Sequence, residues 1–125
     1  MIENIKLLYV DDEEINRQLF KIHFANKYEI FIAEDGRQGL EVLENQDGII
    51  IVISDMKMPY MNGIEFVKIA KERFPSKKFY ILTGYEITPE IKEALENGLI
   101  INYFNKPFDI NQINASIKSV CKDCF

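Results

Sequence analysis

The chain of 125 residues has few of the features that mark membrane, secreted or nucleic-acid-binding proteins. No apolar run approaches the roughly 20 residues that a membrane span needs. The first six residues include an acidic side chain and lack the basic and long apolar regions of a signal peptide. Basic residues number 15 against 20 acidic ones, and the net charge of −5 argues against direct binding to a nucleic-acid backbone. We therefore expect a cytoplasmic protein that contacts neither membrane nor nucleic acid directly.

The chain also lacks any Gly/Ser linker, internal repeat or low-complexity tract that would mark a domain boundary. Its length is enough for one hydrophobic core and too short for a second folded unit. Hydrophobic residues make up 47% and charged residues 28%, as in ordinary globular domains. We predict a single domain over residues 1–125.

Cysteine and histidine are scarce, with two and one residues respectively. Cys121 and Cys124 form a C-x-x-C pair, but the chain offers neither the two further ligands of a zinc site nor the strand–helix setting of a redox motif. Their helical spacing with Ile113 and Ile117 favours two thiols that pack as small apolar groups. The single histidine, His23, lies one position off the apolar face of a predicted helix, where we expect partial exposure and no functional role.

Short apolar runs rich in Ile and Val alternate with helical patterns along the chain. Such runs indicate buried strands of a parallel sheet. We predict strands near residues 5–10, 29–33, 49–54, 78–83 and 100–104. A helix is expected after each strand, and the predicted helix starts carry the capping residues Asp35, Asn62, Thr88 and Asp109. Five βα units with right-handed crossovers predict an α/β protein built as a three-layer sandwich.

The first helix carries two sets of large apolar side chains. Ile15, Leu19 and Ile22 fall on one face, and Phe20 and Phe24 lie beside them. Apolar side chains at this spacing typically face a core.

Four of the predicted strands end on polar residues of different kinds. Asp11 and Asp12 follow the first strand, Asp55 the third, Thr83 the fourth and Lys106 the fifth. The carboxyl ends of neighbouring parallel strands share one crevice. Three carboxylates, a hydroxyl and an ammonium are therefore expected to converge in a site that suits a hard divalent cation and a phosphoryl group.

Three neighbouring carboxylates repel one another unless a positive charge lies between them. Ligands that are all oxygen favour Mg²⁺, which keeps several waters and takes few protein carboxylates. Asp11 or Asp12 could instead cap the first helix. Capping accounts for only one of the two residues and is compatible with metal binding.

The residues at these strand ends resemble those of the receiver domain of two-component response regulators, over essentially the whole chain. The matching segments are Asp11-Asp12, Asp55-Met56-Lys57-Met58-Pro59 with Gly63, Thr83-Gly84, and Lys106-Pro107-Phe108. The resemblance implies a flavodoxin-like αβα sandwich whose five parallel strands have the order 2-1-3-4-5. It also implies a signalling domain that catalyses only its own phosphorylation and dephosphorylation.

The resemblance implies a role for each residue of the crevice. Asp55 would accept a phosphoryl group from the phosphohistidine of a sensor histidine kinase or phosphotransfer protein. Mg²⁺, or Mn²⁺ in its place, would be bound directly by Asp12 and Asp55, through water by Asp11, and by the backbone carbonyl of Lys57. Lys106 would neutralise charge on the phosphoryl group.

The resemblance further implies a switch and a set of residues that tune the lifetime of the acyl phosphate. Thr83 would move toward the phosphoryl group and Tyr103 would fill the space, although Tyr103 could also be a simple half-buried strand residue. The face formed by the fourth helix, fifth strand and fifth helix would then change its affinity for a partner, an output domain or a second copy. Lys57, Tyr85 and Glu13 are placed to tune the lifetime. Loop geometry is expected to depend on Pro59, Gly63, Gly84 and Pro107.

Three alternatives bear on this interpretation. A flavodoxin-like FMN binder needs a Ser/Thr/Gly-rich phosphate loop after the first strand, where this chain has Asp11 to Glu14. A Mg²⁺-dependent phosphatase with an Asp nucleophile needs a second Asp two residues later, where this chain has Lys57. The third alternative, a receiver excised from a longer hybrid kinase or DNA-binding regulator, stays open.

Overall fold

The computed structural model describes residues 5–84 and 87–121, in which five strands alternate with five helices. The strands are β1 (Lys6–Val10), β2 (Glu29–Ala33), β3 (Ile49–Asp55), β4 (Lys78–Thr83) and β5 (Asn102–Asn105). The helices are α1 (Glu14–Phe24), α2 (Gly36–Asn45), α3 (Gly63–Arg73), α4 (Pro89–Glu96) and α5 (Ile110–Val120). None of the described helices combines the length and hydropathy that a bilayer crossing requires.

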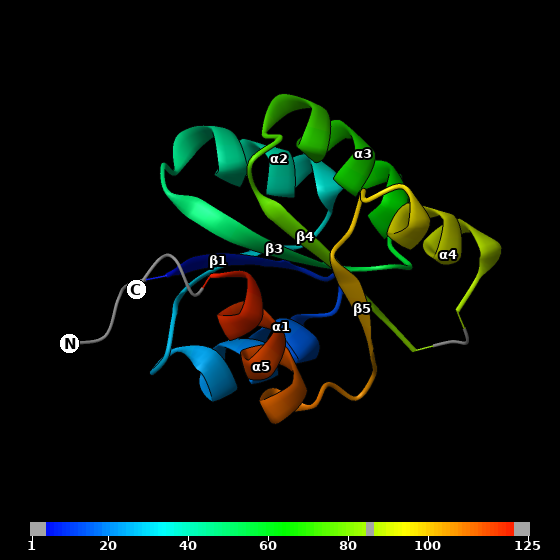
Figure 1. The fold of residues 1–125 in the computed structure, drawn as a ribbon. Coiled ribbons are helices and arrows are strands. Elements are labelled where there is room, and N and C mark those ends of the chain that lie inside the picture. The colour runs from blue at the N-terminus through cyan, green and yellow to red at the C-terminus, as the bar shows by residue number, and fades with distance from the viewer. Residues whose placement is uncertain (1–4, 85–86, 122–125) are drawn as a thin grey trace.

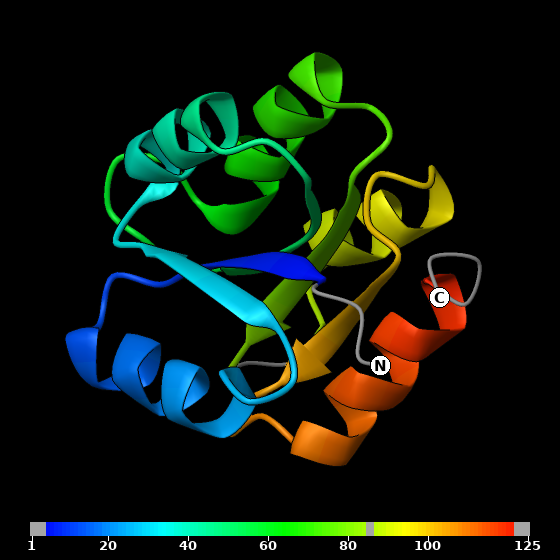
Figure 2. The same ribbon diagram turned by 90° about the vertical axis from the view of Figure 1, so that its left-hand side faces the viewer.

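The strands form one parallel sheet in the order β2-β1-β3-β4-β5, which confirms the predicted order. Helices α2, α3 and α4 cover one face of the sheet, and α1 and α5 cover the other (Figures 1 and 2). The result is the predicted three-layer αβα sandwich. All five strands point the same way, so their carboxyl ends lie along one edge.

Side-chain alternation along the strands divides the core into two halves. In β1, Leu8 and Val10 pack with the helices α2, α3 and α4, whereas Leu7 and Tyr9 pack on the side of α1 and α5. The central strands are buried on both faces, which explains why β3 is a nearly continuous apolar run.

The helix starts follow the predicted capping chemistry. Asn62 and Glu65 form a complete capping box at the start of α3. Thr88 accepts the backbone N–H of Ile91 at 3.2 Å, directly before a proline in the first turn of α4. Asp35 and Asp109 cap α2 and α5 in the same way. These local hydrogen bonds fix where each helix leaves the edge of the sheet.

The apolar side chains of α1 divide between the surface and the core. Ile15, Leu19 and Ile22 are 74%, 43% and 71% exposed, while Phe20 and Phe24 are fully buried. The aromatic pair faces inward, where Phe20 stacks on the ring of Tyr9. An apolar stripe is thereby left on the surface of α1, and it begins with Ile15 at the start of the helix, near the carboxyl end of β1.

Two other predictions differ from the structure only in detail. The fifth strand begins at Asn102 rather than at residue 100, because Ile100 and Ile101 lie in the turn that leads out of α4. His23 is exposed, and its ring meets the edge of Phe108 at 5.8 Å between centroids. Cys121 is buried at the end of α5 as predicted, and Cys124 lies outside the described residues.

Candidate functional site

The carboxyl ends of β1, β3, β4 and β5 surround a cavity of about 590 Å³. It is lined by Asp12, Glu13, Asp55, Met56, Lys57, Met58, Pro59, Thr83, Gly84 and Lys106. Ten residues from four separate segments thus meet at one place. Eight of these ten are site residues predicted from the sequence, and the other two, Met56 and Met58, belong to the segment that carries the family resemblance.

Three carboxylates cluster at this cavity, and two of them, Asp12 and Asp55, line it. One oxygen from each of Asp11, Asp12 and Asp55 lies within 4.8 Å of the other two. Asp11 is fully buried and Asp55 is 5% exposed, whereas Asp12 is exposed at the rim. Three oxygen donors this close together fit a hard divalent cation, which would relieve their mutual repulsion.

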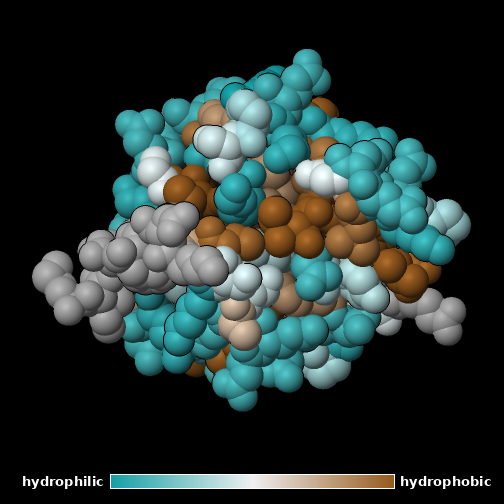
Figure 3. Space-filling view, in the orientation of Figure 1, coloured by the Kyte–Doolittle hydropathy of each residue, from teal (hydrophilic) through white to brown (hydrophobic). Residues whose placement is uncertain are grey.

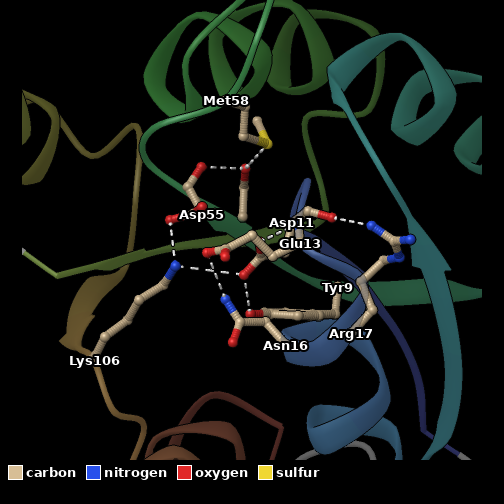
Figure 4. A network of polar contacts seen from close by, with 9 residues as sticks. Tyr9, Asp11, Glu13, Asn16, Arg17, Asp55, Met58 and Lys106 are labelled. Carbon is tan, nitrogen blue, oxygen red and sulfur yellow. Dashed lines mark hydrogen bonds and ion pairs between the residues drawn. The ribbon is translucent and has the colours of Figure 1, made fainter.

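Lys106 lies across the cluster and contacts two of its members (Figure 4). Its ammonium is 3.0 Å from Oδ1 of Asp55 and 3.5 Å from Oδ2 of Asp11. Burial alone would lower the pKa of Lys106, but the two carboxylates outweigh it and raise the pKa above its ordinary value. The backbone N–H of Lys106 donates to the carbonyl of Thr83 at 2.8 Å, and the Lys106–Pro107 peptide bond is cis.

Asp55 carries the clearest electrostatic signature of the site. Its pKa is raised from 3.8 to about 6, mainly by burial and next by the charge of Asp11, while Lys106 lowers it in part. One ammonium therefore does not compensate the burial and crowding of this carboxylate. A second positive charge in the cavity would stabilise the ionised carboxylates, as expected for a cation site.

The loop after β3 requires glycine at position 63. A Cβ on Gly63 would lie 2.4 Å from the backbone oxygen of Asp55 and 2.9 Å from Cδ1 of Ile81. The N–H of Gly63 donates to the carbonyl of Met56 at 2.7 Å, which closes the loop that contains Lys57 and Pro59. Gly63 thereby holds the backbone on either side of Lys57 against the cavity.

Gly84 differs from Gly63, because a Cβ there would meet Lys106 only at 3.8 Å, an ordinary contact distance. Thr83 is buried at the end of β4 and faces the cavity, and Tyr103 is half-buried against the core beneath α3 and α4. Lys57 and Glu13 both line the cavity from opposite sides. Tyr85, the remaining predicted tuning residue, lies outside the described residues.

Three residues that were not predicted from the sequence support the cluster from behind. The hydroxyl of Tyr9 donates to Oδ2 of Asp11 at 2.6 Å, and Arg17 donates to the backbone carbonyl of Asp11 at 2.8 Å. The hydroxyl of Ser54 donates to the backbone carbonyl of Asp55 at 2.9 Å. Tyr9 could have been found from strand alternation, since residues two apart in a strand share a face.

The helix caps do not account for both residues of the acidic pair. The N-cap position of α1 falls on Glu13, whose backbone N–H donates to Oδ1 of Asp11 at 3.0 Å. Asp11 thus orders the chain before the helix and still takes part in the carboxylate cluster. The exposed carboxylate of Asp12 borders the cavity itself.

A parallel αβα sandwich with an acidic cluster and a lysine at its carboxyl edge defines a class of signalling domain, and comparison with known proteins agrees. The family model of the response regulator receiver domain matches residues 7–118. The chain therefore belongs to the receiver domains of two-component systems. The sporulation initiation phosphotransferase F of Bacillus subtilis is 34% identical over 116 residues, with 92% of each chain covered.

Two further proteins extend this likeness. The probable chemotaxis protein CheY of Rhizobium etli is 34% identical over 122 residues, which cover 94% of this chain and 93% of that one. The response regulator protein TrrA of Thermotoga maritima, solved in complex with Mg²⁺–BeF, has a TM-score of 0.80 and 27% identity. The alignment covers 92% of this chain and 97% of that structure. These are the proteins that this chain is similar to in fold and sequence.

Proposed function

We propose that Asp55 accepts a phosphoryl group from a phosphohistidine of a sensor histidine kinase or phosphotransfer protein, and that Mg²⁺ is the required cofactor. The observation that carries this proposal is the Lys106 ammonium 3.0 Å from Oδ1 of Asp55, at the floor of an open cavity with two further carboxylates. A carboxylate with an adjacent cation and a cation site suits a phosphoryl acceptor, because phosphoryl transfer depends on positioning and charge neutralisation.

In the proposed reaction, a carboxylate oxygen of Asp55 attacks phosphorus in line with the imidazole nitrogen. The O–P bond forms as the N–P bond breaks, and the imidazole leaves with its electron pair. The Lys106 ammonium is placed to pair with the Asp55 carboxylate before transfer and with the phosphoryl oxygens after it. Attack requires ionised Asp55, and a carboxyl with a pKa of about 6 is mostly ionised at neutral pH.

The residues fit Mg²⁺ in both charge and donor type. Asp12 and Asp55 would bind the cation directly, Asp11 would act through water, and the Lys57 carbonyl in the loop held by Gly63 would supply a further oxygen. When bound, the cation supplies charge neutralisation at the phosphoryl oxygens. The similarity to TrrA, solved with Mg²⁺–BeF, supports this assignment.

We further propose that phosphorylation is communicated through Thr83 and Tyr103. Thr83 is buried at the rim of the cavity, and Tyr103 lies on the adjacent edge strand β5, two residues from the register partner of Thr83. An apolar band runs across the middle of the molecule in the view of Figure 3. Ile101, directly before β5, is 42% exposed. A partner, output domain or second copy that contacts α4, β5 and α5 would detect a rotation of Tyr103.

The exposed stripe of α1 supports a protein as the phosphoryl donor. Ile15 and Ile22 lie on the helix that begins directly after Glu13 at the rim of the cavity. A donor that brings phosphohistidine to Asp55 must cover this rim, and apolar side chains beside it would add affinity. Ile15→Ser should slow transfer from a phosphohistidine-bearing protein and leave labelling by acetyl phosphate unchanged. Ile69→Ser on α3, also partly exposed, is the matched control.

We place this function in the cytoplasm, where the ATP that charges histidine kinases is found, and assign it to one receiver domain over residues 1–125. The domain would act as a monomer or as a phosphorylation-dependent dimer. A relay role is supported by the likeness to the phosphotransferase of B. subtilis.

The test is phosphorylation by acetyl phosphate with Mg²⁺, followed by intact-mass spectrometry and peptide mapping. One phosphoryl group should appear at Asp55, and addition of a chelator or Asp55→Asn should abolish it. Asp47→Asn, an exposed carboxylate at the opposite edge of the sheet, serves as the control and should label normally. Equal labelling of Asp55→Asn would exclude the assignment.

A further inference from the structure

Tyr9 has a buried hydroxyl beside the acidic cluster that the proposed transfer reaction does not use. Its side chain is fully buried in the central strand β1, on the same strand face as Asp11 two residues later. The ring lies along the strand, and its hydroxyl donates to Oδ2 of Asp11 at 2.6 Å (Figure 4). A short hydrogen bond to a buried carboxylate is among the stronger kinds in proteins.

The ring of Tyr9 is held in place by α1. Phe20 stacks on it with 4.1 Å between centroids and 3° between planes. Phe20 is itself packed against Phe24 and Phe108, at 4.5 Å and 5.5 Å between centroids. A continuous aromatic cluster thus fixes the position of the hydroxyl. The inward-facing Phe20 of α1 therefore not only buries apolar surface but also holds the ring of Tyr9.

Each oxygen of the Asp11 carboxylate has a defined partner. Oδ1 accepts the backbone N–H of Glu13 at 3.0 Å, and Oδ2 accepts the hydroxyl of Tyr9. The Lys106 ammonium stands farther from Oδ2, at 3.5 Å, than from Asp55, at 3.0 Å. Tyr9 therefore sets the rotation of Asp11 and occupies the oxygen that would otherwise draw Lys106 away from Asp55.

We infer that Tyr9 is a positioning residue of the cation site, which acts through Asp11 and keeps the Lys106 ammonium on Asp55. This inference rests on the proposed function, because it assigns the Asp11 carboxylate to Mg²⁺ binding. Groups that orient metal ligands from behind commonly contribute about 10- to 100-fold to metal affinity or activity. Loss of the hydroxyl would free Asp11 to rotate and would let the ammonium move toward it.

The first test compares Tyr9→Phe with Tyr80→Phe by calorimetric titration with Mg²⁺. Tyr80 is the matched control because it is also fully buried in a central strand on the same side of the sheet, but its hydroxyl is paired with Ser116. Tyr9→Phe should weaken Mg²⁺ binding about tenfold. Tyr80→Phe should bind Mg²⁺ as the wild type does. Equal affinities for Tyr9→Phe and wild type would overturn the inference.

A double-mutant cycle tests whether Tyr9 acts through Asp11. In an Asp11→Asn background, Tyr9→Phe should cause no further loss of Mg²⁺ affinity, since the carboxylate it orients is gone. If the losses of Mg²⁺ affinity from the two substitutions add up, the inference is overturned, even when Tyr9→Phe alone weakens Mg²⁺ binding. A wild-type protein that binds no Mg²⁺ would overturn both the inference and the proposed function, so the two failures are distinguishable.

A second variant should displace the Tyr9 hydroxyl without removing a polar group. Phe20→Leu removes the ring that stacks on Tyr9 and should weaken Mg²⁺ binding severalfold. Phe79→Leu, which shortens an equally buried ring in the core on the opposite face of the sheet, is its control and should leave the affinity unchanged. Equal Mg²⁺ affinities for these two variants would count against positioning by the aromatic cluster.

Discussion

Replacement of Asp55 by Asn should stabilise the domain in the absence of divalent cations. The pKa of Asp55 is raised from 3.8 to about 6, so the folded protein disfavours the ionised carboxylate. A shift of about two units corresponds to roughly 3 kcal/mol at neutral pH. Asn resembles the protonated carboxyl in size and carries no charge. The shift already includes the attraction of Lys106, so we expect the variant to gain up to about 3 kcal/mol.

The pH dependence gives this prediction its sign. A carboxyl whose folded pKa lies above its unfolded value contributes stability that is present below the unfolded pKa and is lost as pH rises through the folded pKa. For Asp55 the loss falls between about pH 4 and about pH 6. The advantage of Asp55→Asn should therefore be near zero at about pH 4 and complete above about pH 7.

Urea unfolding followed by far-UV circular dichroism, in chelator and across this pH range, measures the difference. Other carboxylates titrate in both proteins and cancel to first order. Asp47→Asn, at an exposed position on the opposite edge of the sheet, is the control and should not stabilise the domain at neutral pH as Asp55→Asn does. If the advantage of Asp55→Asn is absent at neutral pH, or is independent of pH, the argument from burial and Asp11 is wrong.

Three further predictions concern neighbouring residues. In calorimetric titrations, Asp12→Ala should weaken Mg²⁺ binding by more than about tenfold and Asp11→Ala by less. An unchanged Mg²⁺ affinity in the double variant would exclude the site. Gly63→Ala should destabilise the fold by about 2 kcal/mol in urea unfolding, because its Cβ meets backbone at 2.4 Å, whereas Gly84→Ala should leave stability nearly unchanged. Beryllium fluoride should shift NMR signals of residues 87–105 far more than those of 36–46, and Thr83→Ala should remove these remote shifts; shifts confined to the Asp55 surroundings in the wild type would contradict the switch.

The carboxyl edge of the sheet could be predicted from sequence because it depends on short-range patterns. Each strand is an apolar run, each run ends on a polar residue, and parallel strands bring those ends together. Asp55 and Lys106 lie 51 positions apart in the chain and 3.0 Å apart in space for this reason alone. The helix caps were predictable for a similar reason, since a cap depends on three or four consecutive residues.

The orientation of α1 could not be predicted in the same way. Its two apolar stripes, one aliphatic and one aromatic, have the same helical period, so periodicity does not choose between them. The choice depends on what lies opposite, which is the Tyr9 ring on one side and Phe108 from the loop before α5 on the other. Both contacts join different segments of the chain, and neither can be recognised from the hydrophobic pattern of the helix itself.

The role of Tyr9 escaped prediction because its residue type suits a buried strand as well as a site. Strand alternation places Tyr9 on the face of Asp11, but only packing determines that the ring lies along the strand rather than across it. The same hydrogen bond could not form from Val or Ile, which would satisfy the apolar pattern equally well. A polar-tipped aromatic two residues before a strand-end carboxylate is therefore a signal that hydrophobicity alone does not carry.

Burial of the carboxylate cluster links the stability of the domain to its function. The raised pKa of Asp55 means that the ionised carboxylate lowers the free energy of unfolding. The packing of the surrounding sheet offsets this loss of stability. A cation that binds the three carboxylates removes part of that cost only in the folded state, so it must stabilise the fold by mass action. The positioning contacts from Tyr9 and Gly63 prevent the cluster from relaxing by rotation or by movement of the loop. Because the repulsion cannot be released locally, a bound cation is the means by which it would be relieved, and this couples occupation of the cavity to the stability of the domain.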